Sequence, residues 1–104
     1  MVFRGSFSKF MNRKQIINEF ESELGKLLKK YNCELIDFEY YHRIFGNMVL
    51  TIRFKDITLD FVTDRGEIYC NGEFLCDYEY LRRENKTTPQ KLLEQIELKL
   101  KTIQ

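Results

Sequence analysis

The sequence predicts a two-layer α+β domain, in which an N-terminal and a C-terminal helix cover one face of an antiparallel meander of four or five strands. Apolar residues recur every three to four positions near both ends of the chain and every second position in its middle. The first period is typical of amphipathic helices and the second of strands with one buried face. The expected order is therefore α-β-β-β-β(-β)-α, with residues 12–104 as a single domain and residues 1–11 as a flexible tail.

The first helix is expected over residues 12–31. Asn12 is suited to cap its first turn, with Gln15 three residues later as in a capping box. Asn32 is suited to the left-handed conformation that ends many helices. The apolar stripe that predicts the helix consists of Ile16, Ile17, Phe20, Leu24, Leu27, Leu28 and Tyr31.

The middle of the chain predicts the sheet. Period-two alternation runs through the segments CELIDFEYY, NMVLTIRFK and ITLDFVTD, and each reads as a strand with one buried and one solvated face. In the first segment we expect Ile36 to face the core and Asp37 and Glu39 to face water. EIYC and EFLC flank Asn71-Gly72, the strongest short hairpin signal; whether a fifth strand forms at residues 73–76 is left open.

The second helix is expected to begin at Thr88-Pro89, a capping residue followed by proline at the first helical position. Its apolar face consists of Leu92, Leu93, Ile96, Leu100 and Ile103.

The cysteines and the lack of targeting signals point to the cytosol. Cys33, Cys70 and Cys76 are an odd number without C-x-x-C spacing, and no secretory or membrane-spanning segment is apparent. We therefore expect reduced, mostly buried thiols in a cytoplasmic protein. A disulfide between Cys70 and Cys76 across the hairpin is the less favoured alternative.

Charge is segregated along the chain although the net charge is only +1. Residues 1–33 carry a net +4, residues 34–80 a net −6 and residues 81–104 a net +3. The predicted sheet is therefore acidic and the predicted helices are basic.

The turn Asp64-Arg65-Gly66 raises the question of whether it serves folding or binding. Asp64 and Gly66 are explained as turn residues of a three-residue loop. Arg65 is not, because the turn requires nothing of its side chain. An exposed arginine at a loop tip is either simply solvated or a hydrogen-bonding fork for a partner.

No pattern in the sequence predicts catalysis, a metal site or a cofactor. The single histidine, His42, has no nucleophile beside it in any recognisable motif, and we expect a structural or exposed role for it. The cysteines lack the paired spacing of a zinc site, the carboxylates do not form a calcium loop, and no phosphate-binding glycine motif is present. We therefore expect a protein that is not an enzyme and that binds no cofactor or metal.

The helix-free face of the predicted sheet is the better candidate for function. Its acidic residues would be Asp37, Glu39, Asp60 and either Glu67 or Glu73, interleaved with Tyr41, Val49 and Val62. Such a face suits a basic protein partner, with charge raising the association rate and aromatic anchors supplying affinity. A face that merely keeps the protein soluble is the alternative. The basic residues of the helices suggest RNA, although the favoured interpretation is that they are lysines on the solvated side of amphipathic helices.

The order of elements and the run from IFGNMVLTIRF through ITLDFVTDRGEIYC add a resemblance. They include a Gly-Asn turn, two long strands and an Asp-Arg-Gly hairpin before a Tyr/Cys strand. Over about residues 12–76 the chain resembles the small cytosolic immunity proteins of bacterial polymorphic-toxin and contact-dependent inhibition systems. The resemblance implies stoichiometric inhibition of one toxin domain, often a nuclease, and it transfers no contact residue.

The leading hypothesis is thus an immunity protein that binds a basic toxin domain. The charge and turn arguments assign the partner-binding residues as Asp37, Glu39, Tyr41, Asp60, Asp64 and Arg65. The alternative is a phage- or mobile-element-encoded regulator that binds a host protein or RNA through its basic helices. Binding to nucleic acid is disfavoured because an acidic sheet repels phosphate, and no membrane association is expected.

Overall fold

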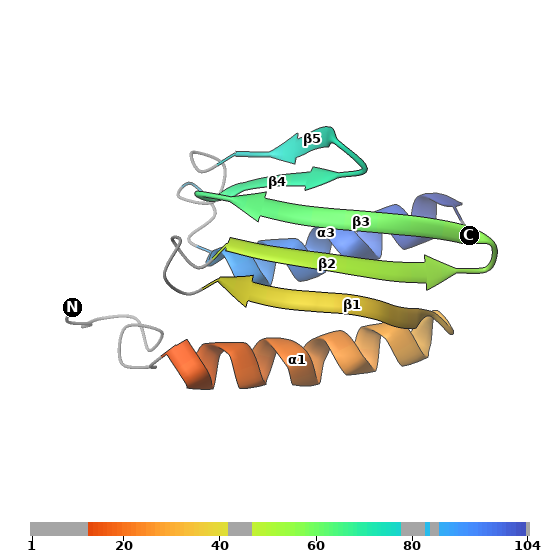
Figure 1. Cartoon of the computed structure of the whole chain (residues 1–104), viewed down its shortest axis with the longest axis horizontal. Coiled ribbons are helices and arrows are strands. Elements are labelled where there is room, and N and C mark those ends of the chain that lie inside the picture. The colour runs from red at the N-terminus through yellow and green to blue at the C-terminus, as the bar shows by residue number, and fades with distance from the viewer. Residues whose placement is uncertain (1–12, 42–46, 78–82, 84–85, 104) are drawn as a thin grey trace.

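Five strands form one antiparallel sheet in which each strand pairs with its neighbour in the chain (Figure 1). The computed structural model describes residues 13–41, 47–77, 83 and 86–103. The elements are α1 (Arg13–Lys30), β1 (Glu34–Tyr41), β2 (Asn47–Phe54), β3 (Ile57–Asp64), β4 (Glu67–Cys70), β5 (Glu73–Cys76) and α3 (Thr88–Ile103). The predicted α+β meander is confirmed, and the fifth strand forms.

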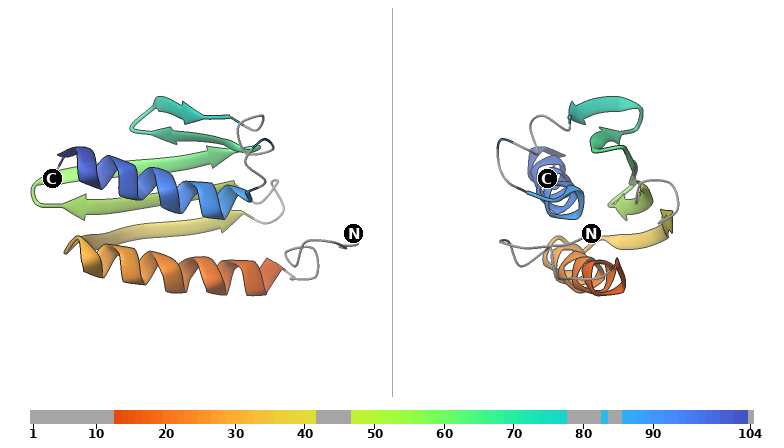
Figure 2. Two further views of the ribbon diagram at one scale, coloured as in Figure 1. Left: turned by 180° about the vertical axis from the view of Figure 1, so that it is seen from behind. Right: turned by 90° about the vertical axis from the view of Figure 1, so that its left-hand side faces the viewer.

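Both helices lie on the same side of the sheet (Figure 2). α1 runs alongside β1, and α3 crosses behind the central strands. The core lies between these two layers, where the side chains are almost completely excluded from solvent. Its fully buried members include Phe20 of α1, Met48, Leu50, Ile52, Phe61, Ile68 and Cys70 of the sheet, and Leu92, Ile96 and Leu100 of α3.

The C-terminus of α1 is closed by a Schellman motif. Asn32 has a φ of 57°, which confirms its predicted left-handed conformation. Its N–H donates to the carbonyl of Lys29 (3.2 Å), and the N–H of Cys33 donates to the carbonyl of Leu28 (2.8 Å). These two bonds satisfy helix-end carbonyls and turn the chain directly into β1. The predicted cap at Asn12 and the predicted tail lie outside the described residues.

A capping box starts α3, one residue earlier than the sequence predicts. The cap is Thr87 rather than Thr88, because the N–H of Gln90 donates to the Thr87 hydroxyl (3.3 Å) and the Gln90 side chain accepts from the Thr87 N–H (2.9 Å). This reciprocal pair satisfies two donors at the helix start. Pro89 then occupies the first turn, where no hydrogen bond is required of its nitrogen.

A bulge in β1 makes the prediction for Ile36 wrong. Leu35 pairs with Ile52 and Asp37 pairs with Thr51, so one extra residue is inserted between them. Ile36 is 44% exposed instead of buried. The bulge leaves the alternation beyond it as predicted: Asp37 and Glu39 are exposed, and Phe38 packs against the core.

Two-residue turns join the last three strands. Asp64 belongs to β3 and pairs with Glu67, so the loop is Arg65-Gly66 and not the predicted three residues. Arg65 and Gly66 have φ values of 52° and 91°, and positive φ at both positions is the signature of a type I′ turn. Asn71-Gly72 forms the same kind of turn, with φ values of 51° and 83°.

Cys33, Cys70 and Cys76 are not joined in a disulfide. Cys70 and Cys76 are buried and Cys33 is partly buried, as the sequence predicts, and burial raises the pKa of the Cys33 and Cys70 thiols. No helix in the described part of the chain is long and apolar enough to cross a membrane.

Candidate functional site

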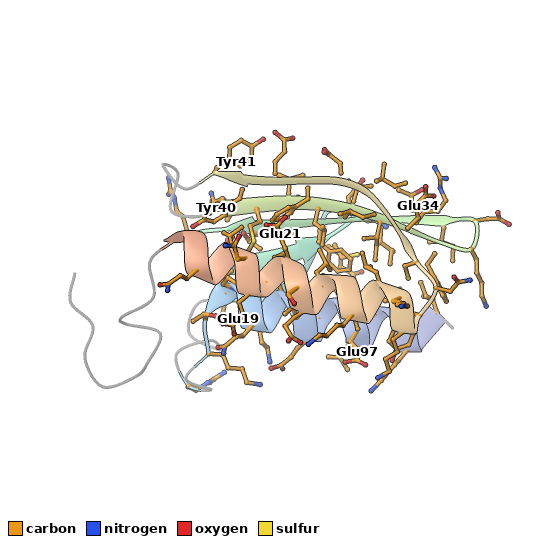
Figure 3. The ribbon with its side chains drawn as sticks, turned by 90° about the horizontal axis from the view of Figure 1, so that it is seen from below. Glu19, Glu21, Glu34, Tyr40, Tyr41 and Glu97 are labelled. Atoms are coloured by element: carbon orange, nitrogen blue, oxygen red, sulfur yellow. The ribbon has the colours of Figure 1, made fainter. Side chains whose placement is uncertain are left out.

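The sheet face opposite the helices, called the open face below, is the candidate site. Among the described residues no helix or strand covers it (Figure 2). Figure 3 shows the two sides of β1 at one point: Tyr41 projects away from the helices, whereas Tyr40 projects toward them. Because directly paired residues of antiparallel strands point to the same side, the strand registers define rows that cross the open face.

An apolar row crosses the middle of the open face. The pairs are Val49 with Val62, Val62 with Tyr69, and Tyr69 with Phe74. The rings of Tyr69 and Phe74 meet edge-on, with centroids 5.7 Å apart. Phe74 is 51% exposed and Val62 37% exposed, so the row offers apolar surface to a partner. Glu39 pairs with Val49 and ends the row on β1.

A first acidic row runs along one side of the apolar row. Asp37 pairs with Thr51, and Thr51 pairs with Asp60. The Thr51 hydroxyl donates to Asp60 Oδ1 at 2.7 Å. Both carboxylates are exposed, and this hydrogen bond fixes the direction of the Asp60 side chain.

A second acidic row runs along the other side. It consists of Tyr41, Asn47, Asp64 and Glu67, which follow one another across β1 to β4. Asn47 Nδ2 donates to Asp64 Oδ1 (3.3 Å), and Asn47 Oδ1 accepts from the Arg65 N–H (2.9 Å). Asn47 therefore fastens the β3–β4 turn to β2 and orients the Asp64 carboxylate.

Two tyrosine–glutamate hydrogen bonds, one on β1 and one on β4, connect the apolar row to the second acidic row. The Tyr41 hydroxyl donates to Glu39 Oε2 at 2.7 Å, and the Tyr69 hydroxyl donates to Glu67 Oε1 at 2.6 Å. In each pair the hydrogen bond to the carboxylate is the main cause that raises the pKa of the tyrosine. Both phenols therefore stay protonated as donors at neutral pH.

Most carboxylates of the open face differ from those near the helices, because they have no cationic partner. On the helix side Glu73 pairs with Lys99 (3.8 Å), Glu97 with Lys30 (2.9 Å), and Glu94 with Lys86 and Lys91. Glu34, at the start of β1, pairs directly with Arg53 and also lies on the open face, where it forms an ion pair with Arg53 (3.1 Å). Within the described chain, no lysine or arginine nitrogen lies within 4.0 Å of the five other open-face carboxylates. These five are Asp37, Glu39, Asp60, Asp64 and Glu67.

The structure brings the predicted site residues onto one face. Asp37, Glu39, Tyr41, Asp60 and Asp64 are all exposed there. Arg65 is exposed at the tip of the adjoining turn.

The choice between the two remaining glutamates is also resolved. Glu67 lies on the open face, whereas Glu73 pairs with Cys70 on the helix side. His42 lies outside the described residues.

Sequence reasoning missed the aromatic end of the apolar row. The Asn71-Gly72 turn already implied that Tyr69 pairs with Phe74, because a two-residue loop pairs the second residues on either side of it. That register also places Tyr69 beside Val62. The sequence therefore contained the information, but using it requires following the alternation of side-chain direction from β3 through the β3–β4 and β4–β5 hairpins.

The helix side offers less to a ligand. A shallow open groove of about 260 Å³ lies between α1 and α3; it is lined by Glu23, Lys26, Leu27, Lys30, Leu93, Glu94 and Glu97. Its cations Lys26 and Lys30 are already paired with Glu23 and Glu97. In the described part of the chain no group of three or more His, Cys, Asp or Glu side chains is placed to hold a metal ion.

The geometry therefore singles out the open face, with its central apolar row and two acidic rows. The chain matches no protein-family model, and no curated protein or solved structure is significantly similar to it.

Proposed function

We propose that this protein is a non-enzymatic inhibitor, an immunity protein, that binds one basic bacterial toxin domain through the open face and blocks it stoichiometrically. The observation that carries the proposal is the set of open-face carboxylates without a cationic partner in the described chain. These carboxylates surround exposed apolar side chains. A surface of this kind is complementary to a protein that presents cations around an apolar centre.

Two physical effects contribute to binding, one to the association rate and the other to the affinity. The uncompensated negative charge attracts a basic partner over a distance of about 10 Å at moderate salt and raises its association rate. The apolar row then supplies affinity, because Tyr69 and Phe74 are large rings that lose exposed apolar surface on contact. A rigid sheet costs little conformational entropy when it binds.

A nuclease domain is a suitable partner, because the proposal requires a protein that presents cations on its binding surface. Its active-site cleft must attract phosphate groups and is therefore rich in lysine and arginine. An acidic protein face that covers such a cleft competes for the same cations. Inhibition then requires no chemistry from the inhibitor.

Protection of growing cells tests this function. The toxin to use is the C-terminal domain of the protein encoded immediately upstream of this gene, expressed with and without this chain. Wild-type protein should preserve viability, and the variant with Asp37→Lys, Glu39→Lys and Asp60→Lys should not.

The matched control makes the same change in net charge on the helix side. Glu19, Glu21 and Glu23 are exposed on α1, and their replacement by lysine should leave protection intact. Loss of protection in the control as well would mean that net charge, and not the open face, is responsible. Full protection by the open-face variant would contradict the proposal.

The same assay distinguishes the proposed immunity protein from the alternative, a regulator that binds through its basic helices. That alternative requires Lys26, Lys29 and Arg83, so their replacement by glutamine should abolish function. Under the present proposal these replacements have no effect on protection.

A further inference from the structure

The two tyrosine–glutamate pairs repeat one local design. Glu39 and Tyr41 on β1, and Glu67 and Tyr69 on β4, both have the spacing Glu-x-Tyr, which places the two side chains on the same side of a strand. In both pairs the hydroxyl donates to the carboxylate, at 2.7 and 2.6 Å. The hydrogen bond holds the ring and the carboxylate next to each other before any partner arrives.

The pairs are arranged head to tail across the sheet. Glu39 and Tyr69 stand in the apolar row, whereas Tyr41 and Glu67 stand in the second acidic row. A half-turn about an axis between β2 and β3 therefore exchanges the two pairs. The two valines of the apolar row lie between them.

Each pair has the features that recognise a guanidinium group. One oxygen of each carboxylate accepts the tyrosine hydroxyl, which leaves the second oxygen to accept from a partner. The adjacent ring is exposed at Tyr41 and partly exposed at Tyr69, and an aromatic ring attracts a cation to its face. Arginine uses both at once, since its planar fork donates hydrogen bonds and stacks on aromatic rings.

The spacing of the pairs restricts the partner. β1 and β4 are three strand spacings apart, about 14 Å, and the two carboxylates, Glu39 and Glu67, stand in neighbouring rows, about 7 Å apart along the strands. The two carboxylates are therefore about 16 Å apart. Two residues separated by eleven positions in an α-helix are about 16.5 Å apart and lie on the same side of the helix.

We propose that the open face receives two arginine side chains of one partner, one at Glu39–Tyr41 and one at Glu67–Tyr69, with aliphatic side chains of the partner over Val49 and Val62. This proposal rests on the proposed function and specifies how the toxin domain is recognised. It implies that the partner presents arginines about 16 Å apart on one surface.

A designed peptide serves as the probe. It is a side-chain-stapled helix of alanine and glutamine with arginine at positions i and i+11 and leucine at positions i+4 and i+7. Isothermal titration calorimetry at low salt measures its binding to the whole protein. Replacement of either arginine by citrulline, which keeps the shape and removes the charge, should weaken binding about tenfold.

A second peptide tests the spacing. It carries the same residues with the second arginine moved to i+9, on another side of the helix, and should also bind about tenfold more weakly. Equal affinity of the two peptides would overturn the two-site arrangement.

Protein variants assign each arginine to its pair. Glu39→Gln should remove the affinity that one of the two arginines contributes, and Glu67→Gln the affinity that the other contributes. A double-mutant cycle with the citrulline peptides should therefore show coupling only between each glutamate and its own arginine. Glu21→Gln on α1 is the control and should bind like wild type. Uniform weakening without matched coupling would also overturn the proposal, as would self-association of the protein that Glu39→Gln and Glu67→Gln abolish.

Failure of this inference is distinguishable from failure of the proposed function. If Glu39→Gln and Glu67→Gln keep both peptide affinity and protection while the open-face lysine variant loses protection, only the two-arginine inference is wrong. If the peptide binds with matched coupling but the chain protects no cells, the docking geometry stands and the immunity function is wrong.

Discussion

Asn71 holds the β4–β5 turn against the backbone of Asp60 through two hydrogen bonds. The N–H of Asn71 donates to the carbonyl of Asp60, and the N–H of Asp60 donates to Asn71 Oδ1, both at 2.8 Å. The side chain thus supplies the acceptor that a continuing strand would supply with its backbone. The turn and the first acidic row are thereby connected, because Asp60 belongs to both.

Replacement of Asn71 should destabilise the protein through this connection. Asn71→Ala loses the acceptor for the Asp60 N–H and places a side chain that disfavours positive φ at 51°. We expect the free energy of unfolding to fall by about 1–2 kcal/mol. Urea unfolding followed by circular dichroism measures it. Asn71→Gly keeps the turn conformation and loses only the acceptor, so its loss should be smaller; an equal loss would mean that the conformational part of the argument is wrong.

Two residues on opposite sides of α3 test how this helix packs on the sheet. Ile96 is fully buried and Leu98 is 55% exposed. Ile96→Ala should lower the free energy of unfolding by about 2–5 kcal/mol, because it leaves a cavity between α3 and the sheet. Leu98→Ala should change it by about 0.5 kcal/mol or less. Similar losses for both would show that α3 packs differently.

The contact between the helices predicts a dependence of stability on acid. Glu97 accepts from Lys30 Nζ (2.9 Å) and from the Tyr31 hydroxyl (3.0 Å), and these bonds lower the pKa of its carboxyl, with the Lys30 bond as the larger cause. A carboxyl with a lowered folded-state pKa stabilises the fold above its unfolded pKa of about 4.3. This contribution is lost as the pH falls through the lowered pKa of Glu97 in the folded state.

Urea unfolding between pH 6 and pH 3 measures this effect. The stability advantage of wild type over Glu97→Gln should be complete near pH 6 and should shrink toward pH 3. Tyr31→Phe should retain most of the pH dependence and Lys30→Met should remove most of it. The reverse order of these two variants would contradict the assignment of the main cause.

The sequence predicts well those structural features that depend on residues close together in the chain. The end of α1 at Asn32 and the two-residue turn at Asn71-Gly72 follow from the conformations these residues prefer. Asp37 and Asp60 could be placed on the same face because alternation within a strand is a local property. The candidate site was predictable to the extent that it follows from this alternation.

Features that depend on residues far apart were not predictable in this way. The bulge at Ile36 depends on how β1 fits against β2. The adjacent apolar residues Leu35 and Ile36 interrupt the alternation there, but they do not indicate which of the two is the extra residue. The bond between Lys30 and Glu97 joins residues 67 positions apart. The helix-side position of Glu73 depends on the register of two successive hairpins.

Arg65 has a backbone role and a predicted binding role, and substitution separates them. Its φ of 52° in a type I′ turn with Gly66 is a conformation that asparagine adopts more readily than arginine. Arg65→Asn should therefore leave a free energy of unfolding about 1–2 kcal/mol higher than Arg65→Val does, because β-branched residues are strained at positive φ; urea unfolding measures the difference.

The binding role of the Arg65 side chain is tested against the toxin domain that we propose as the partner. If the guanidinium group contacts the partner, Arg65→Asn keeps the turn and yet dissociates faster from the immobilised toxin domain in surface plasmon resonance. Its association rate should not fall, since the substitution removes a positive charge from a face that attracts cations. An unchanged dissociation rate would show that Arg65 serves the turn alone, and the partner contacts would then lie entirely on the strands.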